Sequence, residues 1–182
     1  MKLLCVVLAL LATATHAQLP ATNAAVVVAV LPAQPAASKA LVIAVTVPAP
    51  LPAVWQAFTT SEGLSTWLAP TGVVDLRVGG DWTARFPGGS TGGGTILSFI
   101  LQQELVLSAM APDRFPNVRA QRTRARFRFE ARGDSTFVEL TQTGWQDGDE
   151  WNKAYEYLTV GNAQLMATLH HRFVSGPIDW TK

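Results

Sequence analysis

Arginines occur at every second position in "RTRARFRFEARGDSTFVEL", namely at Arg122, Arg124, Arg126 and Arg128. Such a stripe could hold an anion, because the guanidinium group pairs well with phosphate and carboxylate oxygens. It could also be the solvent-facing side of a β-strand, since successive side chains of a strand point to opposite faces of a sheet. The choice between the two interpretations depends on the elements around the stripe.

Three other polar clusters do not form a catalytic set. The segment "PGGSTGGGT" lacks the Gly-Lys-Ser/Thr ending of a phosphate-binding loop and leads into a strand, which favours a hairpin loop. His170 and His171 are neighbours in a predicted helix and point about 100° apart, so they cannot readily share one metal ion. The carboxylates of "DGDE", Asp147 to Glu150, suit a helix start better than a calcium loop. We therefore predict no catalytic residue, no metal site and no cofactor.

Residues 1–17, "MKLLCVVLALLATATHA", have the features of a signal peptide: one basic residue, an apolar run and small residues at the end. The run is shorter than the roughly 18 residues that a membrane-spanning helix requires. We expect an exported protein, periplasmic or secreted, that is cleaved near Ala17 and has no membrane span. Cleavage would remove Cys5, the only cysteine, and with it any disulfide or thiolate metal site.

The charge balance argues against a nucleic-acid partner. Cleavage would remove Lys2 from the 14 Lys and Arg, which leaves as many basic as acidic residues, 13 of each. Proteins dedicated to nucleic acids depend on an excess of basic residues that pair with phosphates. The length and apolar content that remain suit one domain with a sizeable core.

Residues 18–39 form a predicted tether. The segment is rich in Ala, Val and Pro, and Pro20, Pro32 and Pro35 interrupt any regular element. Its run from Ala24 to Leu31 could instead be a strand or an extension of the export signal. From Ala40 the pattern becomes regular, so residues 40–182 are expected to form a single domain.

The domain begins with a predicted strand, "ALVIAVTV", and two short helices. The first helix starts near Pro52, a residue that suits the first turn of a helix. Apolar residues at helical spacing support both helices: Val54, Trp55 and Phe58 in the first, and Leu64, Trp67 and Leu68 in the second.

Antiparallel hairpins are predicted next. In "VVDLRVGGDWTARF", a three-residue loop, residues 79–81, would place Val74 opposite Phe86 and Asp75 opposite Arg85. That register collects the apolar residues of both strands on one face. The segment "GTILSFILQQELVLSAM" predicts a second hairpin, which turns near Gln102 and Gln103.

The arginine stripe belongs to a third predicted hairpin. With a two-residue turn at Gly133 and Asp134, Phe127 faces Leu140 on one side of the sheet, and the arginines lie on the other side. There Arg128 faces Glu139, so one register suits both faces. Since one face of an antiparallel sheet commonly meets water, we favour a solvent-exposed stripe. A weak anion-binding or docking patch is the alternative.

A long helix ends the domain, from about Asp149 to Phe173. Asp147 or Asp149 is the expected cap, and Gly176 with Pro177 ends the helix. One side of it is apolar except for one amide; that side holds Trp151, Tyr155, Leu158, Asn162, Leu165, Met166, Leu169 and Phe173.

This order of elements resembles the START-like helix-grip superfamily, also called SRPBCC. The motifs that carry the resemblance are "VPAPLPAVWQAFTTSEGLSTWLAP", "LRVGGDW", "GTILSF", "VELTQTGWQDGDEW" and "GPIDW". The closest match is the branch named after the activator of the heat-shock-protein-90 ATPase. The resemblance covers roughly residues 40–182. It implies an α+β fold in which a curved antiparallel sheet grips the long C-terminal helix, with an apolar cavity between them.

The residues expected to line this cavity are Trp82, Phe127, Phe129 and Leu140 from the sheet, and Tyr155, Leu158, Asn162, Met166 and Leu169 from the helix. In the alternative, these side chains fill the space completely. Gly161 and Asn162 stand where members of this branch commonly carry a bulky aromatic residue nearby, a change that could enlarge the cavity. We expect Asn162 and Tyr155 to form a polar spot for a ligand; the alternative is an amide bonded to protein or water.

Three functions fit the resemblance. The favoured one is an exported, non-catalytic binding domain for a small, largely apolar molecule. The alternatives are an enzyme of cyclase or hydrolase type, with Tyr155 or Asn162 orienting the substrate, and a protein-binding, co-chaperone-like module. Export argues against the heat-shock ATPase itself as partner, because that chaperone class works where ATP is available.

Overall fold

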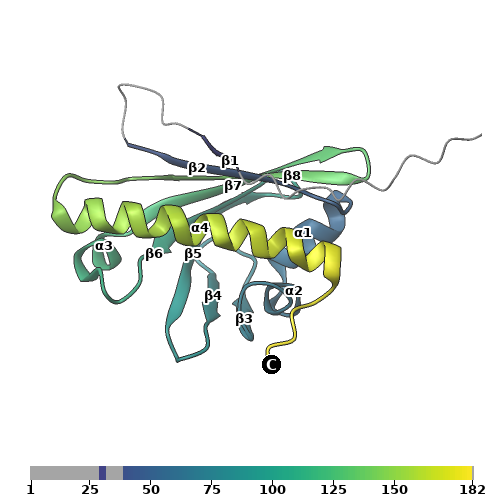
Figure 1. Ribbon diagram of the computed structural model, residues 1–182, viewed down its shortest axis with the longest axis horizontal. Helices are drawn as coiled ribbons and strands as arrows, with labels where there is room; N and C mark the ends of the chain where they lie inside the picture. The colour runs from purple at the N-terminus through teal and green to yellow at the C-terminus, as the bar shows by residue number, and fades with distance from the viewer. Residues whose placement is uncertain (1–28, 32–38, 182) are drawn as a thin grey trace, which may run out of the picture.

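The computed structural model describes residues 29–31 and 39–181 (Figure 1). The predicted signal peptide lies outside the described residues, as does most of the predicted tether. The elements occur in this order: β1 (Ala29–Leu31), β2 (Leu41–Val47), α1 (Leu51–Thr59), α2 (Ser61–Ser65), β3 (Thr71–Val74), β4 (Asp81–Arg85), β5 (Thr91–Ile100), β6 (Glu104–Met110), α3 (Pro116–Gln121), β7 (Thr123–Arg132), β8 (Ser135–Thr143) and α4 (Asp149–Ser175). The strand β1 lies within the predicted tether, where a strand was one alternative.

The described strands form one antiparallel sheet of eight strands, in the order β1-β2-β8-β7-β6-β5-β4-β3. The sheet is curved, and α4 crosses one of its faces; α3 lies near the beginning of α4, and α1 and α2 lie near its end (Figure 1). The predicted α+β fold with a long helix gripped by the sheet is therefore confirmed. Among the residues that the structure describes, no helix is both long and apolar enough to cross a membrane.

The hairpin that carries the arginine stripe has the predicted register. Phe127 pairs with Leu140 and Arg128 pairs with Glu139 across β7 and β8, and Gly133 in the turn has a φ of 61°. The stripe is exposed, whereas Phe127 is buried, so the arginines do lie on the solvent side. The expectation that this face binds no nucleic acid stays a prediction.

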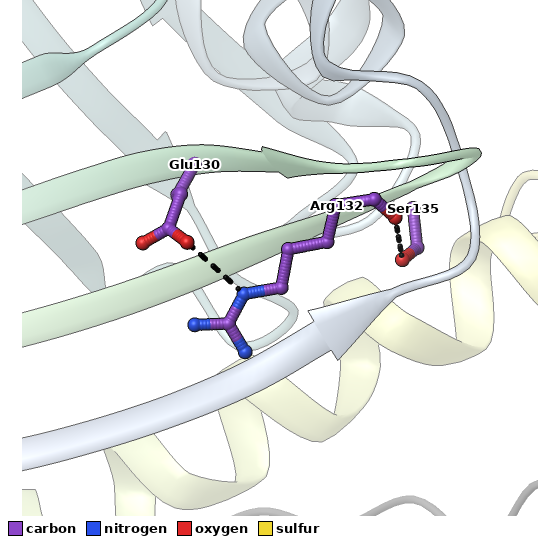
Figure 2. A network of polar contacts seen from close by, with 3 residues as sticks. All are labelled: Glu130, Arg132 and Ser135. Atoms are coloured by element: carbon purple, nitrogen blue, oxygen red, sulfur yellow. Dashed lines mark hydrogen bonds and ion pairs between the residues drawn. The ribbon is translucent and has the colours of Figure 1, made fainter.

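The tip of this hairpin is held together by its own polar groups (Figure 2). The Nε of Arg132 donates to Oε1 of Glu130 at 3.3 Å, and the Oγ of Ser135 donates to the Arg132 carbonyl at 2.8 Å. The Arg132 guanidinium also lies 4.0 Å from the ring centre of Phe137. Exposed pairs of this kind contribute little to stability, typically about 0 to 1 kcal/mol.

The turn between β5 and β6 also lies where the sequence predicts it. The strands end at Ile100 and restart at Glu104, and Gln102 between them has a φ of 57°. The register slips once, between Ile96 and Ser98, which marks a bulge in the ladder. The bulge explains why a continuous apolar run did not reveal the register of this hairpin.

The predicted register of the first hairpin is wrong. Val74 pairs with Trp82 rather than with Phe86, so the loop spans residues 75–80 instead of three residues. The Asp75 carboxylate forms an ion pair with Arg77, Oδ2 to Nε at 2.7 Å, and not with Arg85. Alternation of apolar residues alone did not distinguish these registers, because both keep Val74 on the inner face.

The wider loop is explained by the neighbouring strand. The N–H of Gly79 donates to the Ile96 carbonyl, and the N–H of Ile96 donates to the Gly80 carbonyl, each at 2.8 Å. A Cβ on Gly80 would lie 2.0 Å from the Asp75 carbonyl oxygen, so only glycine fits this approach. Hydrogen bonds to β5 therefore replace those of a tight turn.

The centre of the core is Phe58 of α1. Its ring centre lies 4.8 Å from Trp67, 5.1 Å from Phe127 and 5.0 Å from Phe129. The indole N–H of Trp82 donates to the Phe58 carbonyl at 2.7 Å, so a buried polar group is satisfied at the same point. This aromatic cluster joins α1 to the sheet.

The prediction that Asp147 or Asp149 caps α4 is wrong. The N-cap is Gly148, whose φ is 127°, and no side chain among the described residues caps it. Asp149 and Glu150 lie in the first turn instead, where carboxylates suit the helix dipole. The other end agrees with the sequence: α4 stops at Ser175, and Gly176 follows with a φ of 93°.

Candidate functional site

A pocket of about 390 Å³ opens between the middle of α4 and the end of the sheet formed by β4, β5 and β6. One wall comes from α4, and the others come from the β4–β5 hairpin, the end of β6 and the segment after α2. The lining residues are Trp67, Leu68, Phe86, Ser90, Thr91, Gly92, Gly93, Met110, Pro112, Tyr157, Leu158, Gly161, Asn162, Gln164, Leu165 and Thr168.

Two neighbouring rows of residues on α4 form the helical wall. The inner row is half-buried and consists of Leu158, Asn162 and Leu165. The outer row consists of Tyr157, Gly161, Gln164 and Thr168. Both rows follow the three- and four-residue spacing that aligns side chains along a helix. Gly161 therefore interrupts the outer row between two larger side chains.

The opposite wall combines aromatic rings with bare backbone. Trp67 is held in place because its indole N–H donates to the Ala57 carbonyl at 2.9 Å. Gly93 has a φ of 108°, and a Cβ there would lie 2.1 Å from the Trp82 carbonyl oxygen. The close approach of β4 and β5 therefore requires glycine at this position. Part of this wall consequently has no side chains.

The C-terminal tail supports the same wall from behind. The N–H of Ile178 donates to the Thr66 carbonyl at 2.9 Å, and the indole N–H of Trp180 donates to the Ser65 carbonyl at 2.6 Å. These bonds attach the residues after α4 to the segment that ends α2. Trp67 and Leu68, which follow directly, are thereby held against the pocket.

A chain of hydrogen bonds joins α4 to the sheet beside the pocket. The Nδ2 of Asn162 donates to Oε1 of Gln142 at 2.9 Å, and the Nε2 of Gln142 donates to Oγ1 of Thr123 at 2.7 Å. Gln142 and Thr123 are buried. Asn162 thus bonds to the protein itself, as in the alternative to a ligand-binding amide. Its Oδ1 accepts no hydrogen bond from the described residues.

Tyr155 does not reach this pocket. Its hydroxyl donates to the Ala40 carbonyl at 3.1 Å, and its ring centre lies 5.0 Å from that of Trp145. Tyr155 and Asn162 lie seven positions apart, which is about 10.5 Å along a helix. The pocket covers only the middle turns of α4, so the structure does not bring these two side chains together into one polar spot.

The pocket has an uncharged lining. None of its lining residues is Asp, Glu, Lys, Arg, His or Cys. The Arg114 guanidinium lies 5.1 Å from the ring centre of Tyr157, and Arg114 itself does not line the pocket. Because a charge that enters an apolar pocket without a partner loses its hydration, this lining favours uncharged molecules.

A comparison with protein-family models shows which family has this sequence pattern. Residues 48–171 match the family model described as "Activator of Hsp90 ATPase homolog 1-like protein". The chain belongs to this family. The match confirms the resemblance that the motifs indicated, and it includes all the residues that line the pocket. The sequence has no significant match among curated proteins.

Several solved structures share the fold at low sequence identity. The solution structure of the Aha1 dimer from Colwellia psychrerythraea is 19% identical, with a TM-score of 0.61 over 76% of this chain and 98% of that chain. Protein MLL2253 from Mesorhizobium loti is 16% identical, with a TM-score of 0.64 over 77% and 100%. CalU16 from Micromonospora echinospora is 22% identical, with a TM-score of 0.59 over 86% and 88%. These likenesses establish the fold alone.

The structure brings two of the predicted cavity residues, Leu158 and Asn162, to the pocket. The other predicted residues besides Tyr155 lie in the packed core, at 0 to 6% exposure: Trp82, Phe127, Phe129, Leu140, Met166 and Leu169. In that region the side chains fill the space between sheet and helix, as in the alternative of complete filling. A ligand contact for each of these residues stays a prediction.

Sequence reasoning missed most of the pocket wall. Tyr157, Gln164 and Thr168 were not predicted, and neither was the segment from Ser90 to Gly93, which was interpreted only as a hairpin loop. The available signal was Gly161: residues three or four positions away from it share its face of the helix. The strand residues carried no comparable signal, because their position depends on the register of β4 and β5.

His170 is buried but lies outside the pocket. Its side chain is 7% exposed, and its Nδ1 has no hydrogen-bond partner among the described residues. Burial lowers the pKa of His170, and the neighbouring His171 lowers it further. Within the described ranges, no three His, Cys, Asp or Glu side chains gather where they could hold a metal ion.

Proposed function

We propose that this protein is an exported, non-catalytic binding domain for a small, largely apolar molecule held between α4 and the sheet. The observation that carries the proposal is the pocket of about 390 Å³ with its uncharged lining. Its size lies within the range of small-molecule sites, roughly 300 to 1,000 Å³. Such sites are mostly apolar and use few polar groups to orient what they bind.

The lining favours binding over catalysis. General acid–base catalysis uses groups that exchange protons near the working pH, such as histidine or a carboxylate. The hydroxyl groups of Ser90, Thr91 and Thr168 line the pocket, yet no histidine, lysine or carboxylate lies beside them in the lining. A serine or threonine nucleophile requires such a neighbouring base. An enzyme of cyclase or hydrolase type is therefore the second candidate.

Polar groups in the pocket can orient a ligand without reacting with it. Asn162 presents an amide beside the apolar side chains of Leu158 and Leu165. Its bond to Gln142 fixes the orientation of this amide, and its Oδ1 can accept a hydrogen bond.

Export is supported by the sequence of residues 1–17. N-terminal sequencing of the protein from the periplasm or the medium should begin at or near Gln18. Recovery of the chain in the cytoplasm with an intact Met1 would contradict export and would make a cytoplasmic protein partner the better proposal.

Native mass spectrometry tests the binding function. We expect protein purified from its own source to carry a neutral small molecule, visible as an added mass that is lost on unfolding. Leu158→Gln should lower the occupancy, because it places an amide in the apolar wall. Val160→Gln is the matched control: Val160 is 72% exposed and does not line the pocket. Conversion of the bound molecule to a product of different mass would favour the enzyme instead.

A further inference from the structure

Gly161 lies in the interior of α4, twelve residues after its first residue, Asp149. Glycine destabilises the interior of a helix relative to alanine, because it has more backbone freedom to lose on folding. A glycine at such a position commonly has a structural reason, either a left-handed backbone or a close neighbour.

The fold supplies neither reason here. Gly161 is not among the described residues with positive φ. A Cβ built at Gly161 would meet no heavy atom within 4 Å. Two other glycines differ in this respect. A Cβ on Gly63 would lie 2.3 Å from the Gln56 carbonyl oxygen, and a Cβ on Gly93 would lie 2.1 Å from the Trp82 carbonyl oxygen. The backbone around Gly161 therefore accepts a larger residue.

The space beside Gly161 belongs to the pocket. Gly161 interrupts the outer row of α4 between Tyr157 and Gln164, and all three residues line the pocket. The missing side chain leaves a notch in this row, next to Asn162 of the inner row. A side chain of ordinary size at position 161 would occupy part of the volume that is open now.

We infer that Gly161 is a specificity-determining residue: its notch admits an uncharged, ring-containing molecule with one hydrogen-bond donor directed at Asn162. This inference rests on the proposed binding function. Trp67, Phe86 and Tyr157 line the pocket and offer aromatic surfaces that suit a ring system. The donor matches the Oδ1 of Asn162, an acceptor without a partner among the described residues.

Two dyes with one skeleton test the charge preference. N-phenyl-1-naphthylamine is neutral and carries one N–H donor; 8-anilinonaphthalene-1-sulfonate adds a sulfonate to the same rings. We expect the neutral dye to bind at one site with increased fluorescence. The sulfonate should bind at least about tenfold more weakly, because its charge finds no partner in the lining. Equal affinities would overturn the preference for uncharged molecules.

Substitution of Gly161 tests its role. Gly161→Leu should lower the affinity for the neutral dye by at least about tenfold, because the new side chain fills part of the pocket. The melting temperature should stay the same or rise, since leucine favours a helix more than glycine does. Val160→Leu is the matched control on the exposed side of the same turn, and it should leave the affinity unchanged.

Two outcomes distinguish a wrong role for Gly161 from a wrong binding function. If the neutral dye binds Gly161→Leu as tightly as the unmodified protein and is lost in Leu158→Gln, the pocket binds the dye and Gly161 does not determine its specificity. If neither dye binds the unmodified protein, the proposed binding function itself fails.

Discussion

The Glu150 carboxylate holds Asn117 through two hydrogen bonds. Oε1 of Glu150 accepts the backbone N–H of Asn117 at 2.8 Å, and Oε2 accepts its side-chain Nδ2 at 2.7 Å. Oε1 also accepts the N–H of Val118 at 3.1 Å. The first turn of α4 thereby satisfies the free N–H groups at the start of α3, a short helix that periodicity did not predict.

Removal of this carboxylate should loosen α3. Glu150→Ala is expected to lower the free energy of unfolding by about 1 to 2 kcal/mol, the range of a lost helix cap. Urea denaturation monitored by circular dichroism measures the change. Glu156→Ala, at an exposed position of the same helix, is the control and should stay within about 0.5 kcal/mol. An unchanged midpoint for Glu150→Ala would show that α3 does not depend on this contact.

Asn162 should contribute to stability as well as to binding. Asn162→Leu leaves Oε1 of the buried Gln142 without its donor, so we expect a loss of about 1 to 3 kcal/mol. A double-mutant cycle with Gln142→Leu should give a coupling energy of about 0.5 kcal/mol or more. Additive effects of the two substitutions would indicate that the hydrogen bond does not stabilise the fold.

The exposed arginine stripe should be dispensable. Arg124→Gln combined with Arg126→Gln removes the ion pair of Arg126 with Glu104, Nε to Oε2 at 2.6 Å. Because Arg126 is partly exposed, we expect a stability change within about 1 kcal/mol and unchanged dye affinity. Titration of the unmodified protein with single- and double-stranded DNA at low salt is the second measurement. Tight binding that weakens steeply with salt would show that the stripe is an anion site.

Stability should decrease in mild acid because of His170. Burial keeps the pKa of His170 below the usual histidine value of about 6.5, so the unfolded chain takes up a proton first as the pH falls. The free energy of unfolding should therefore fall as the pH drops through 6.5 toward the lowered pKa, and this contribution should level off below it. Denaturant titrations at several pH values measure the slope.

The matched variants are His170→Gln, which should flatten this slope, and His171→Gln, which should keep most of it because His171 is exposed. His171→Gln removes only the smaller cause of the lowered pKa. A slope that persists in His170→Gln would assign the pH dependence to other groups.

Local patterns determined several parts of this protein. Alternation in "RTRARFRFEARGDSTFVEL" and the two-residue turn at Gly133 and Asp134 specify the β7–β8 register, because a slip by one residue would move Phe127 and Phe129 to the solvent side. Helical spacing and Gly176 specify the extent of α4. These features depend on neighbours in the sequence, so they could be predicted without the fold.

Tertiary contacts decided the rest. The β3–β4 loop is wide because Gly79 and Gly80 bond to Ile96 of β5, a partner that lies far along the chain. The pocket lies beside the middle of α4, whereas Phe58, Phe127 and Phe129 are buried in the packed core. Leu158 and Asn162 could be predicted to face the sheet, but the open space beside them depends on how distant elements pack, which no local pattern specifies.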